Sequence, residues 1–184
     1  MRIIAGQWRG RPLVAPGGEA TRPTADRTRE TLFSMLVSRI GAFDDLRVGD
    51  FFAGSGALGL EALSRGAASC LFVEQDRVAI DALKKNCATL GIERPDIRQT
   101  SVLTMGVAPA PLDILFMDPP YGSGAGGVAL DKLARQGWIG PATWVSIETA
   151  KQETIAVKDF ETVADRVVGK AKIHFLRTEA PIET

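Results

Sequence analysis

The 184-residue sequence has few residues that could hold a metal: two cysteines, Cys70 and Cys87, and one histidine, His174. A structural zinc site needs about four Cys, His or carboxylate ligands at recognisable spacing, and the two cysteines form no CxxC pair. No apolar run reaches the roughly 18 residues that a membrane span needs, and residues 1–6 lack the apolar core of a signal peptide. We therefore expect a cytoplasmic protein with no metal site and two reduced, buried thiols.

The chain also lacks a net charge, because it has 22 basic and 22 acidic residues. These charges are unevenly distributed along the sequence. Residues 1–29 contain six arginines and no lysine against Glu19 and Asp26, so this segment carries +4 and the remainder −4. Local charge sets the field that a phosphate backbone meets, and arginine suits bidentate phosphate contacts. The segment therefore predicts a nucleic-acid surface, with a solvated, salt-bridged surface as the alternative.

Strand-like and helix-like segments alternate along most of the chain. Alternating strands and helices predict βαβ units and a parallel sheet covered on both faces, and the last two strands, with no long helix between them, predict an antiparallel edge. We expect one domain over residues 1–184, with a basic hairpin arm at 1–23 and the core at 24–184. The expected strands are 47–52, 69–73, 96–100, 112–117, 143–147, 160–168 and 171–177, and the expected helices are 24–39, 58–65, 76–90 (with Val78, Ile80, Leu83 and Cys87 inward) and 128–136.

A glycine-rich turn follows the first of these core strands. Its sequence, Asp50-Phe51-Phe52-Ala53-Gly54-Ser55-Gly56-Ala57-Leu58-Gly59, contains a GxGxxG pattern between a strand and a helix. Glycines let the chain turn tightly and let a ligand approach the backbone. Glu74 ends the next strand, twenty residues after Gly54, where an acid reaches a ribose hydroxyl. The pattern thus indicates a nucleoside-containing cofactor.

Asp50 favours S-adenosylmethionine over a dinucleotide at this turn. It lies four residues before Gly54, where a carboxylate would repel a pyrophosphate but would attract the ammonium group of a methionine. The alternatives are a helix-capping role for Asp50 and a surface position for Glu74.

A second turn, Asp118-Pro119-Pro120-Tyr121, follows a strongly apolar strand. The prolines stiffen it and leave their carbonyls free to accept hydrogen bonds. Asp118 and the Pro119 carbonyl can accept the two hydrogens of an exocyclic amino group, orient its lone pair and stabilise the charge that develops on nitrogen. Tyr121 offers a flat face for a flipped-out base. The glycine-rich stretch at 122–127 predicts a flexible lip.

With these motifs the sequence resembles the bacterial RsmD-like small-subunit rRNA (guanine-N2)-methyltransferases over nearly its whole length. The opening Met1-Arg2-Ile3-Ile4-Ala5-Gly6-Gln7-Trp8-Arg9-Gly10-Arg11, the block from Arg22 to Phe33, the stretch from Phe52 to Ala67 and the Asp118 turn carry the resemblance. The two N-terminal blocks are the specific part, because the Asp118 turn is shared with other amino-group methyltransferases.

The resemblance implies a Rossmann-like class I methyltransferase fold and methylation of one guanine N2 in 16S rRNA, within an assembled or nearly assembled small subunit. It implies cofactor contacts from Asp50, the turn Ala53, Gly54, Ser55 and Gly56, and Glu74. Where relatives carry an aspartate near the adenine, this chain has Ser101, which we keep with Val102 as a cofactor candidate. Among the arginines we expect some to face RNA and some the cofactor carboxylate. The candidates for RNA contact are Arg9, Arg11, Arg22, Arg27 and Arg29.

Several alternatives remain open from the sequence. The acceptor could be adenine N6 of DNA or RNA, or a glutamine side-chain amide. An NAD-linked oxidoreductase would use the GxGxxG turn, and a non-catalytic RNA-binding module would not need Asp118. Trp8 either stacks on a base or packs the arm down, and His174 is expected to be structural. Nothing in the sequence argues against a monomer.

Overall fold

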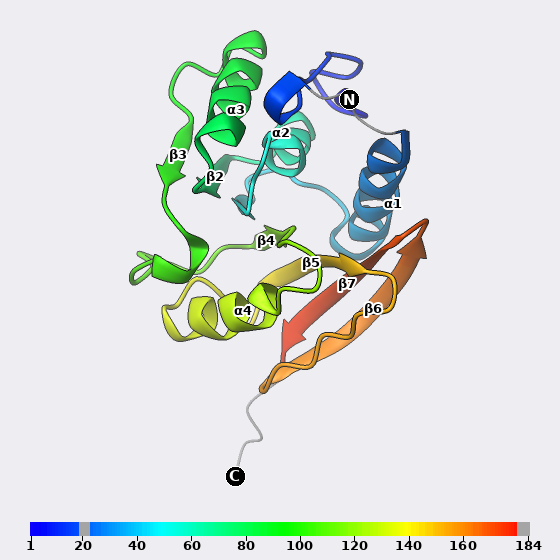
Figure 1. Cartoon of the computed structure of the whole chain (residues 1–184), viewed down its shortest axis with the longest axis vertical. Coiled ribbons are helices and arrows are strands. Elements are labelled where there is room, and N and C mark those ends of the chain that lie inside the picture. Colours follow the sequence, from blue (N-terminus) through cyan, green and yellow to red (C-terminus); the bar gives the residue numbers. More distant parts are fainter. Residues whose placement is uncertain (19–22, 180–184) are drawn as a thin grey trace.

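A seven-stranded mixed sheet forms the centre of the protein (Figure 1). The computed structural model describes residues 1–18 and 23–179. The strand order is β3-β2-β1-β4-β5-β7-β6; the first five strands are parallel, and β7 runs antiparallel to both β5 and β6. This confirms the Rossmann-like class I fold and its antiparallel edge. The strands are β1 (Arg47–Phe51), β2 (Ser69–Glu74), β3 (Asp96–Gln99), β4 (Ile114–Met117), β5 (Trp144–Ala150), β6 (Phe160–Val168) and β7 (Ala171–Thr178).

Helices cover both faces of the sheet, as Figure 1 shows. The helices α1 (Pro23–Ile40), α2 (Ala57–Ser64) and α3 (Arg77–Thr89) pack on one face, and α4 (Ala125–Arg135) packs on the other. All four residues of β4 are buried because successive side chains enter opposite layers. Within the described residues, no helix has both the length and the apolar character that a bilayer crossing requires.

The helix α3 illustrates how local signals set its ends. Asp76 accepts a hydrogen bond from the Ala79 N–H at 2.8 Å and so caps the first turn, and Gly91 continues the chain at φ 77° after the last turn. Ile80, Leu83 and Cys87 are buried as predicted. The prediction for Val78 is wrong: its side chain is 54% exposed, because it lies outside the stripe that faces the sheet.

The glycine-rich lip is shorter than predicted. The helix α4 begins at Ala125 rather than 128, so half of the expected flexible stretch is helical. A Cβ on Gly126 would lie 2.7 Å from Ile147 Cδ1 and 3.1 Å from Pro119 Cγ. Glycine is therefore needed here for close packing of α4 against β5 and the Asp118 turn, and not for flexibility.

The N-terminal arm forms the predicted hairpin, although its antiparallel pairing is limited to one bridge between Arg2 and Pro12. The Ile3 N–H donates to the Arg11 carbonyl and the Gly10 N–H to the Ile3 carbonyl, each at 2.9 Å. The predicted RNA contact Arg22 lies outside the described residues.

Buried polar side chains of α2 and α3 hold the arm on the core. Glu61 is fully buried and accepts hydrogen bonds from the Ile4 and Ala5 N–H groups at 2.8 and 3.0 Å and from Arg65 Nε at 2.8 Å. Asn86 donates to the Val14 carbonyl and accepts from the Val14 N–H. The arm position thus depends on side chains far away in the sequence.

The substitution Glu61→Gln should destabilise the fold by about 3 kcal/mol, since removing one partner of a buried charge network leaves the other charges uncompensated. Urea unfolding measures the loss. The matched control Asp131→Asn breaks the exposed Asp131–Arg135 pair on α4 and should change stability by at most about 0.5 kcal/mol. Equal effects of the two substitutions would contradict the clamping role of Glu61.

Candidate active site

The predicted acids Asp50, Glu74 and Asp118 meet at the carboxyl ends of β1, β2 and β4. The order of the sheet reverses between β1 and β4, and ligands of open α/β sheets bind outside the strand ends at such a point. Phe51 pairs with Met117, and Met117 with Ile147. The residues that follow the last two, Asp118 and Glu148, are therefore neighbours on one edge.

The glycine turn after β1 is tightly held. Gly54 has φ 55°, and the non-glycine residue Phe52 has φ 62°, a conformation that costs about 1–3 kcal/mol and is concentrated at functional sites. Glu74 Oε2 accepts the Gly54 N–H at 2.8 Å, and Glu74 Oε1 accepts the N–H groups of Gln75 and Asp76 at 2.8 and 2.9 Å. Glu74 therefore fixes the shape of the turn as well as bordering the hollow beside it.

Asp50 is 1% exposed and accepts the Gly59 N–H through Oδ2 at 2.8 Å. Asp50 thus bonds an N–H of the first turn of α2, as the helix-capping alternative expected, and the same carboxyl group also lines a cavity, as a cofactor role would require. Burial raises the pKa of Asp50 to about 8; the Gly59 hydrogen bond opposes this shift, and the nearby charges of Asp118 and Glu74 add to it. A cation beside Asp50 would relieve the cost of its negative charge.

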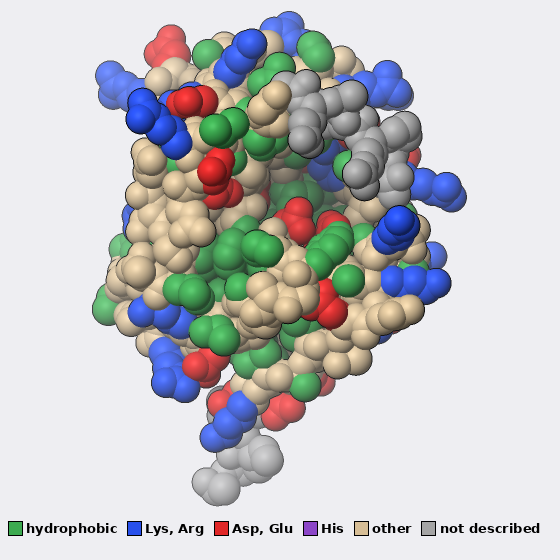
Figure 2. Space-filling view, viewed as in Figure 1, with side chains coloured by type: hydrophobic (Ala, Val, Ile, Leu, Met, Phe, Trp, Pro, Cys, Tyr) green, Lys and Arg blue, Asp and Glu red, His purple; other side chains and the backbone are tan. Residues whose placement is uncertain are grey.

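Two cavities meet at Phe52, Gly54 and Asp118. The outer cavity, between the glycine turn and the Asp118 turn, has a volume of about 530 Å³, within the range of small-molecule sites. The inner cavity, between the glycine turn and α1, has a volume of about 250 Å³ and includes Met1 and Pro16 from the arm segment. In Figure 2 acidic and apolar side chains gather in the hollowed middle of this face, and basic side chains lie toward its edge.

Most of the predicted cofactor residues line these two cavities. The inner cavity includes Asp50, Ala53, Gly54 and Ser55, and the outer one Gly54, Glu74 and Val102. Gly56 and Ser101 do not line either of them. A Cβ on Gly56 would lie 2.2 Å from Leu83 Cδ1, so its glycine serves packing, and the Ser101 hydroxyl accepts the Leu103 N–H at 3.2 Å in a short 3-10 turn. Thr100, which was not predicted, lines the outer cavity instead.

The described linings of the two cavities are strongly acidic. They include five carboxylates and one cationic side chain, Arg29. Such a surface attracts a cation and repels a pyrophosphate. The residues present therefore fit a ligand that carries a sulfonium and an ammonium group better than a dinucleotide. The acids are Asp50, Glu74, Asp76, Asp118 and Glu148.

Arg29 corrects one prediction. Its side chain is 4% exposed, pairs with Asp26 at 3.0 Å and donates to the Arg2 carbonyl, with Glu61 Oε2 3.8 Å from its Nε. A direct contact with RNA is therefore wrong for Arg29, because the Asp26 and Glu61 charges hold it inside the fold. Arg29 also borders the inner cavity.

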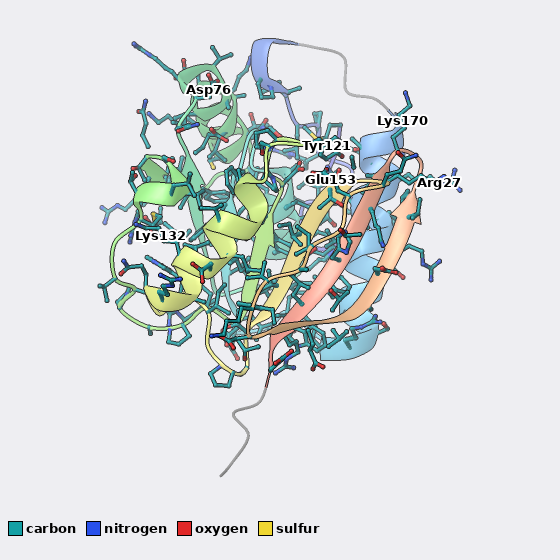
Figure 3. All side chains as sticks on the ribbon, turned by 60° about the horizontal axis from the view of Figure 1, so that its bottom comes forward. Arg27, Asp76, Tyr121, Lys132, Glu153 and Lys170 are labelled. Carbon is teal, nitrogen blue, oxygen red and sulfur yellow. The ribbon has the colours of Figure 1, made fainter. Side chains whose placement is uncertain are left out.

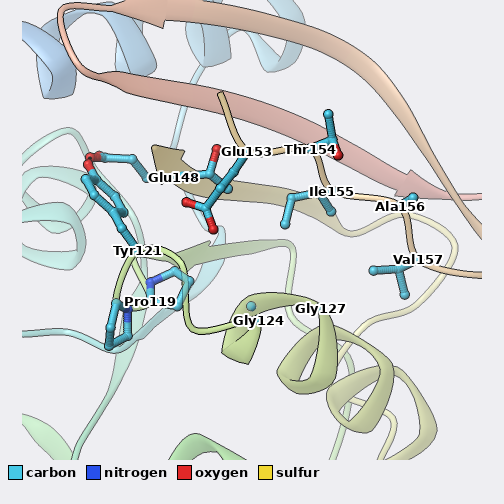
Figure 4. Close-up of a pocket in the computed structure, with 13 residues that line it drawn as sticks. Pro119, Tyr121, Gly124, Gly127, Glu148, Glu153, Thr154, Ile155, Ala156 and Val157 are labelled. Carbon is cyan, nitrogen blue, oxygen red and sulfur yellow. Dashed lines mark hydrogen bonds between the residues drawn. The ribbon is translucent and has the colours of Figure 1, made fainter. Parts of the chain in front are cut away.

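The Asp118 turn is held from β5 and from the loop after it. The Tyr121 hydroxyl donates a hydrogen bond to Glu148 Oε1, and the Gly122 N–H donates to Glu153 Oε1 at 2.9 Å. Figure 3 shows Tyr121 and Glu153 close together, and Figure 4 shows the Tyr121 ring reaching toward Glu148. Burial together with the charge of Glu148 raises the pKa of Asp118 to about 7.

Sequence analysis missed Glu148 because the strand was expected to end at Ile147. The strand continues to Ala150, so Glu148 stands beside Asp118. The signal that could have identified Glu148 was an acid directly after the apolar residues Val145 and Ile147, in the strand expected beside the one that leads to Asp118.

The other predicted RNA contacts lie on and around the arm. Arg9 and Arg27 are exposed and line, with Arg2, a cavity of about 530 Å³ that we call the arm cavity. Arg11 donates to the Thr89 carbonyl at 2.8 Å, at the end of α3. Trp8 packs partly buried against the core. His174 is buried and hydrogen-bonds Thr149, in agreement with a structural role.

Comparisons with known proteins place this geometry in context. The family "Conserved hypothetical protein 95" matches residues 1–177. "Ribosomal RNA small subunit methyltransferase D" of Escherichia coli (strain K12) is 35% identical over 100% of this chain and 93% of the relative, and the Haemophilus influenzae protein of that name is 39% identical over 84% and 81%. A solved structure, "Putative methyltransferase yhhF from Escherichia coli", superimposes with a TM-score of 0.82 at 37% identity over 98% of each chain.

The raised pKa of Asp118 predicts how this carboxyl group titrates. We expect carboxyl-carbon NMR to show Asp118 titrating near pH 7, well above the ordinary value of about 3.9. Glu148→Gln should lower this pKa, because it removes a negative charge that opposes ionisation. The control Glu161→Gln, on the exposed part of β6, should leave it unchanged. An Asp118 pKa that does not respond to Glu148→Gln would contradict the coupling.

Proposed function

Because this chain belongs to the conserved hypothetical protein 95 family, the RsmD-like rRNA methyltransferases, we propose that it methylates the exocyclic N2 amino group of a guanine in 16S rRNA. S-adenosylmethionine is the proposed methyl donor. The observation that carries the proposal is the meeting of two acid-lined cavities at Asp118. Relatives named as small-subunit rRNA methyltransferases support the choice of substrate.

The donor would occupy both cavities. Asp50 would hold the ammonium group in the inner cavity, and Glu74 would accept hydrogen bonds from the ribose hydroxyls in the outer one. The apolar side chain of Val102 would lie against the adenine. Bound S-adenosylmethionine supplies an electrophilic methyl group on a sulfonium. The protein excludes anionic competitors through the carboxylates of the same linings.

Asp118 acts on the acceptor amino group. The amino nitrogen of a base is a poor nucleophile, because its lone pair is delocalised into the ring. Asp118 and the Pro119 carbonyl accept its two hydrogens, turn the lone pair toward the donor and stabilise the positive charge that develops on nitrogen. The ionised carboxylate is needed for this, so the rate should rise as Asp118 loses its proton near pH 7.

Tyr121 supplies the stacking surface for the flipped-out base. Its ring is 50% exposed at the mouth of the outer cavity, and Glu148 and Pro120 limit its movement. Stacking on such a ring contributes roughly 1–3 kcal/mol per base.

The arm and the start of α1 would dock on the small subunit. Arg9 and Arg27 are positioned to contact phosphates around the arm cavity, and Arg11 lies on the same arm. We propose that the enzyme acts as a monomer in the cytoplasm on an assembled or nearly assembled subunit. Contacts between the arm and the surface of the small subunit would then help to determine which nucleotide is methylated.

Asp118→Ala should reduce methyl transfer at least about 100-fold while S-adenosylmethionine affinity stays within a few-fold, since the side chain acts on the acceptor. Labelled S-adenosylmethionine is supplied with small subunits lacking the modification, naked rRNA and DNA in parallel. We expect label on subunits as N2-methylguanine, and calorimetry measures cofactor affinity.

Other outcomes of this experiment identify the alternatives. Label only on DNA, or as N6-methyladenine, would reject guanine N2 of rRNA. NADH binding without affinity for S-adenosylmethionine would indicate an oxidoreductase. Unchanged subunit methylation in Asp118→Ala would remove Asp118 from the chemistry, and equal loss of transfer and of cofactor binding would assign it to folding or cofactor binding.

Arg27→Gln should weaken subunit binding about 3- to 10-fold, because Arg27 is exposed at the arm cavity. The slope of log binding constant against log salt concentration should fall in magnitude by about one, as expected for the loss of one phosphate contact. Filter binding across a salt series measures both. The control Arg135→Gln removes an exposed arginine from α4, on the opposite face of the sheet, and should change neither. Equal effects of the two substitutions would argue against docking through the arm.

A further inference from the structure

Two carboxyl groups, those of Asp118 directly after β4 and of Glu148 in β5, stand side by side. The pairing of Met117 with Ile147 brings the two residues that follow onto the same edge and the same side of the sheet. Both line the inner cavity, and Glu148 also lines a further cavity of about 190 Å³ behind Tyr121, shown in Figure 4. In the proposed function Asp118 acts on the acceptor, whereas Glu148 only holds Tyr121.

Glu148 is held in place but keeps accepting capacity. The Tyr121 hydroxyl donates to its Oε1, and no described residue donates a hydrogen bond to its Oε2. Burial raises the pKa of Glu148, but the Tyr121 hydrogen bond opposes this shift and favours the ionised, accepting form.

Glu153 lies in the same region, but both of its carboxylate oxygens already accept backbone hydrogen bonds. Its Oε1 accepts the Gly122 N–H at 2.9 Å and its Oε2 accepts the Ala150 N–H at 2.8 Å. Both oxygens thus serve the backbone around the lip. Among the residues that the structure describes, Glu148 is therefore the carboxylate beside Asp118 that has an oxygen left for a ligand.

Two adjacent carboxylates suit a base edge with two adjacent donors. Guanine presents its N1–H next to the N2 amino group, so each group would meet one acceptor. Adenine and 2-aminopurine present a lone pair at N1, which would face a carboxylate without a proton between them. A site built for a hydrogen bond rejects an analogue that cannot make it, because its own polar group is left unpaired.

We propose that Glu148 is the specificity-determining residue of this site and accepts the N1–H of the target guanine while Asp118 accepts its amino group. The proposal rests on the function proposed above and deepens it, since it gives a physical reason why guanine is chosen. A role limited to holding Tyr121 is the competing explanation for Glu148. The two explanations differ in whether Glu148 reads the base.

The test uses small subunits reconstituted with rRNA that carries either guanine or 2-aminopurine at the nucleotide that the native enzyme methylates. Both bases have the amino group, but 2-aminopurine lacks the N1–H. We expect the native enzyme to prefer guanine at least about 30-fold in kcat/KM. In Glu148→Gln the amide can rotate and donate to N1, so the preference should fall to within about 3-fold.

Two further variants complete the experiment. Tyr121→Phe removes the hydrogen bond to Glu148 and should slow both substrates alike while the preference for guanine persists. Glu161→Gln, a remote and exposed carboxylate on β6, should leave rates and preference unchanged. Because the preference compares two substrates with one enzyme preparation, a reduced folded fraction cancels from it.

An undiminished preference in Glu148→Gln would overturn the proposal. Loss of the preference in Tyr121→Phe, to the extent seen in Glu148→Gln, would also overturn it and assign Glu148 to positioning Tyr121. If the native enzyme methylates neither substrate, the proposed function itself fails, and the two kinds of failure are thus distinguishable.

Discussion

The burial of several carboxyl groups beside one another, near the carboxyl ends of neighbouring parallel strands, is the constraint on which the site depends. Asp118 follows β4, Asp50 is the penultimate residue of β1, and Glu148 lies in β5 directly after Ile147, the partner of Met117. The fold brings all three to one hollow and removes part of their hydration. Burial, with a smaller contribution from the neighbouring carboxylates, raises the pKa values of Asp50 and Asp118. A cationic ligand beside Asp50 and the donor hydrogens of a base beside Asp118 would relieve the cost of these buried charges. The fold therefore holds an unfavourable arrangement that binding makes favourable.

Holding the acids there requires a rigid surrounding structure, and much of it is supplied by distant buried polar groups. Glu74 joins the glycine turn to the end of β2, because it accepts the Gly54 N–H as well as the N–H groups of Gln75 and Asp76. Asn86 joins the same turn to the arm, because its amide donates to both the Ser55 and Val14 carbonyls at 3.0 Å. Glu61 fixes the start of the arm. Since Met1 and Pro16 line the inner cavity, the position of the arm also determines the shape of that cavity. A shift of the proposed docking segment would therefore also change the shape of the proposed cofactor site.

Local patterns were sufficient for the fold and for the two turns, because hydrophobic periodicity and glycine or proline chemistry act over a few residues. What they missed depends on pairing between distant segments. The burial of Arg29 depends on Glu61, thirty-two residues away, and the role of Glu148 depends on the register between β4 and β5. The need for glycine at position 126 depends on the close packing of α4 against Ile147 and Pro119, which no local signal records. The ends of helices and strands were therefore predicted less accurately than their existence. The expected end of β5 was three residues too early, so Glu148 was not recognised as a site residue.

The separation of charge explains how an acidic site can serve a polyanionic substrate. Five carboxylates line the hollow, while the exposed Arg9 and Arg27 stand on the arm and α1. A phosphate backbone is attracted to the second surface and repelled from the first. An uncharged base can enter the hollow without this repulsion, so flipping the base out of its stack separates the part of the nucleotide that the site accepts from the part that it rejects. The net charge of zero is the balance between a basic N-terminal segment and an acidic remainder. The total charge of the chain therefore does not indicate whether it binds RNA.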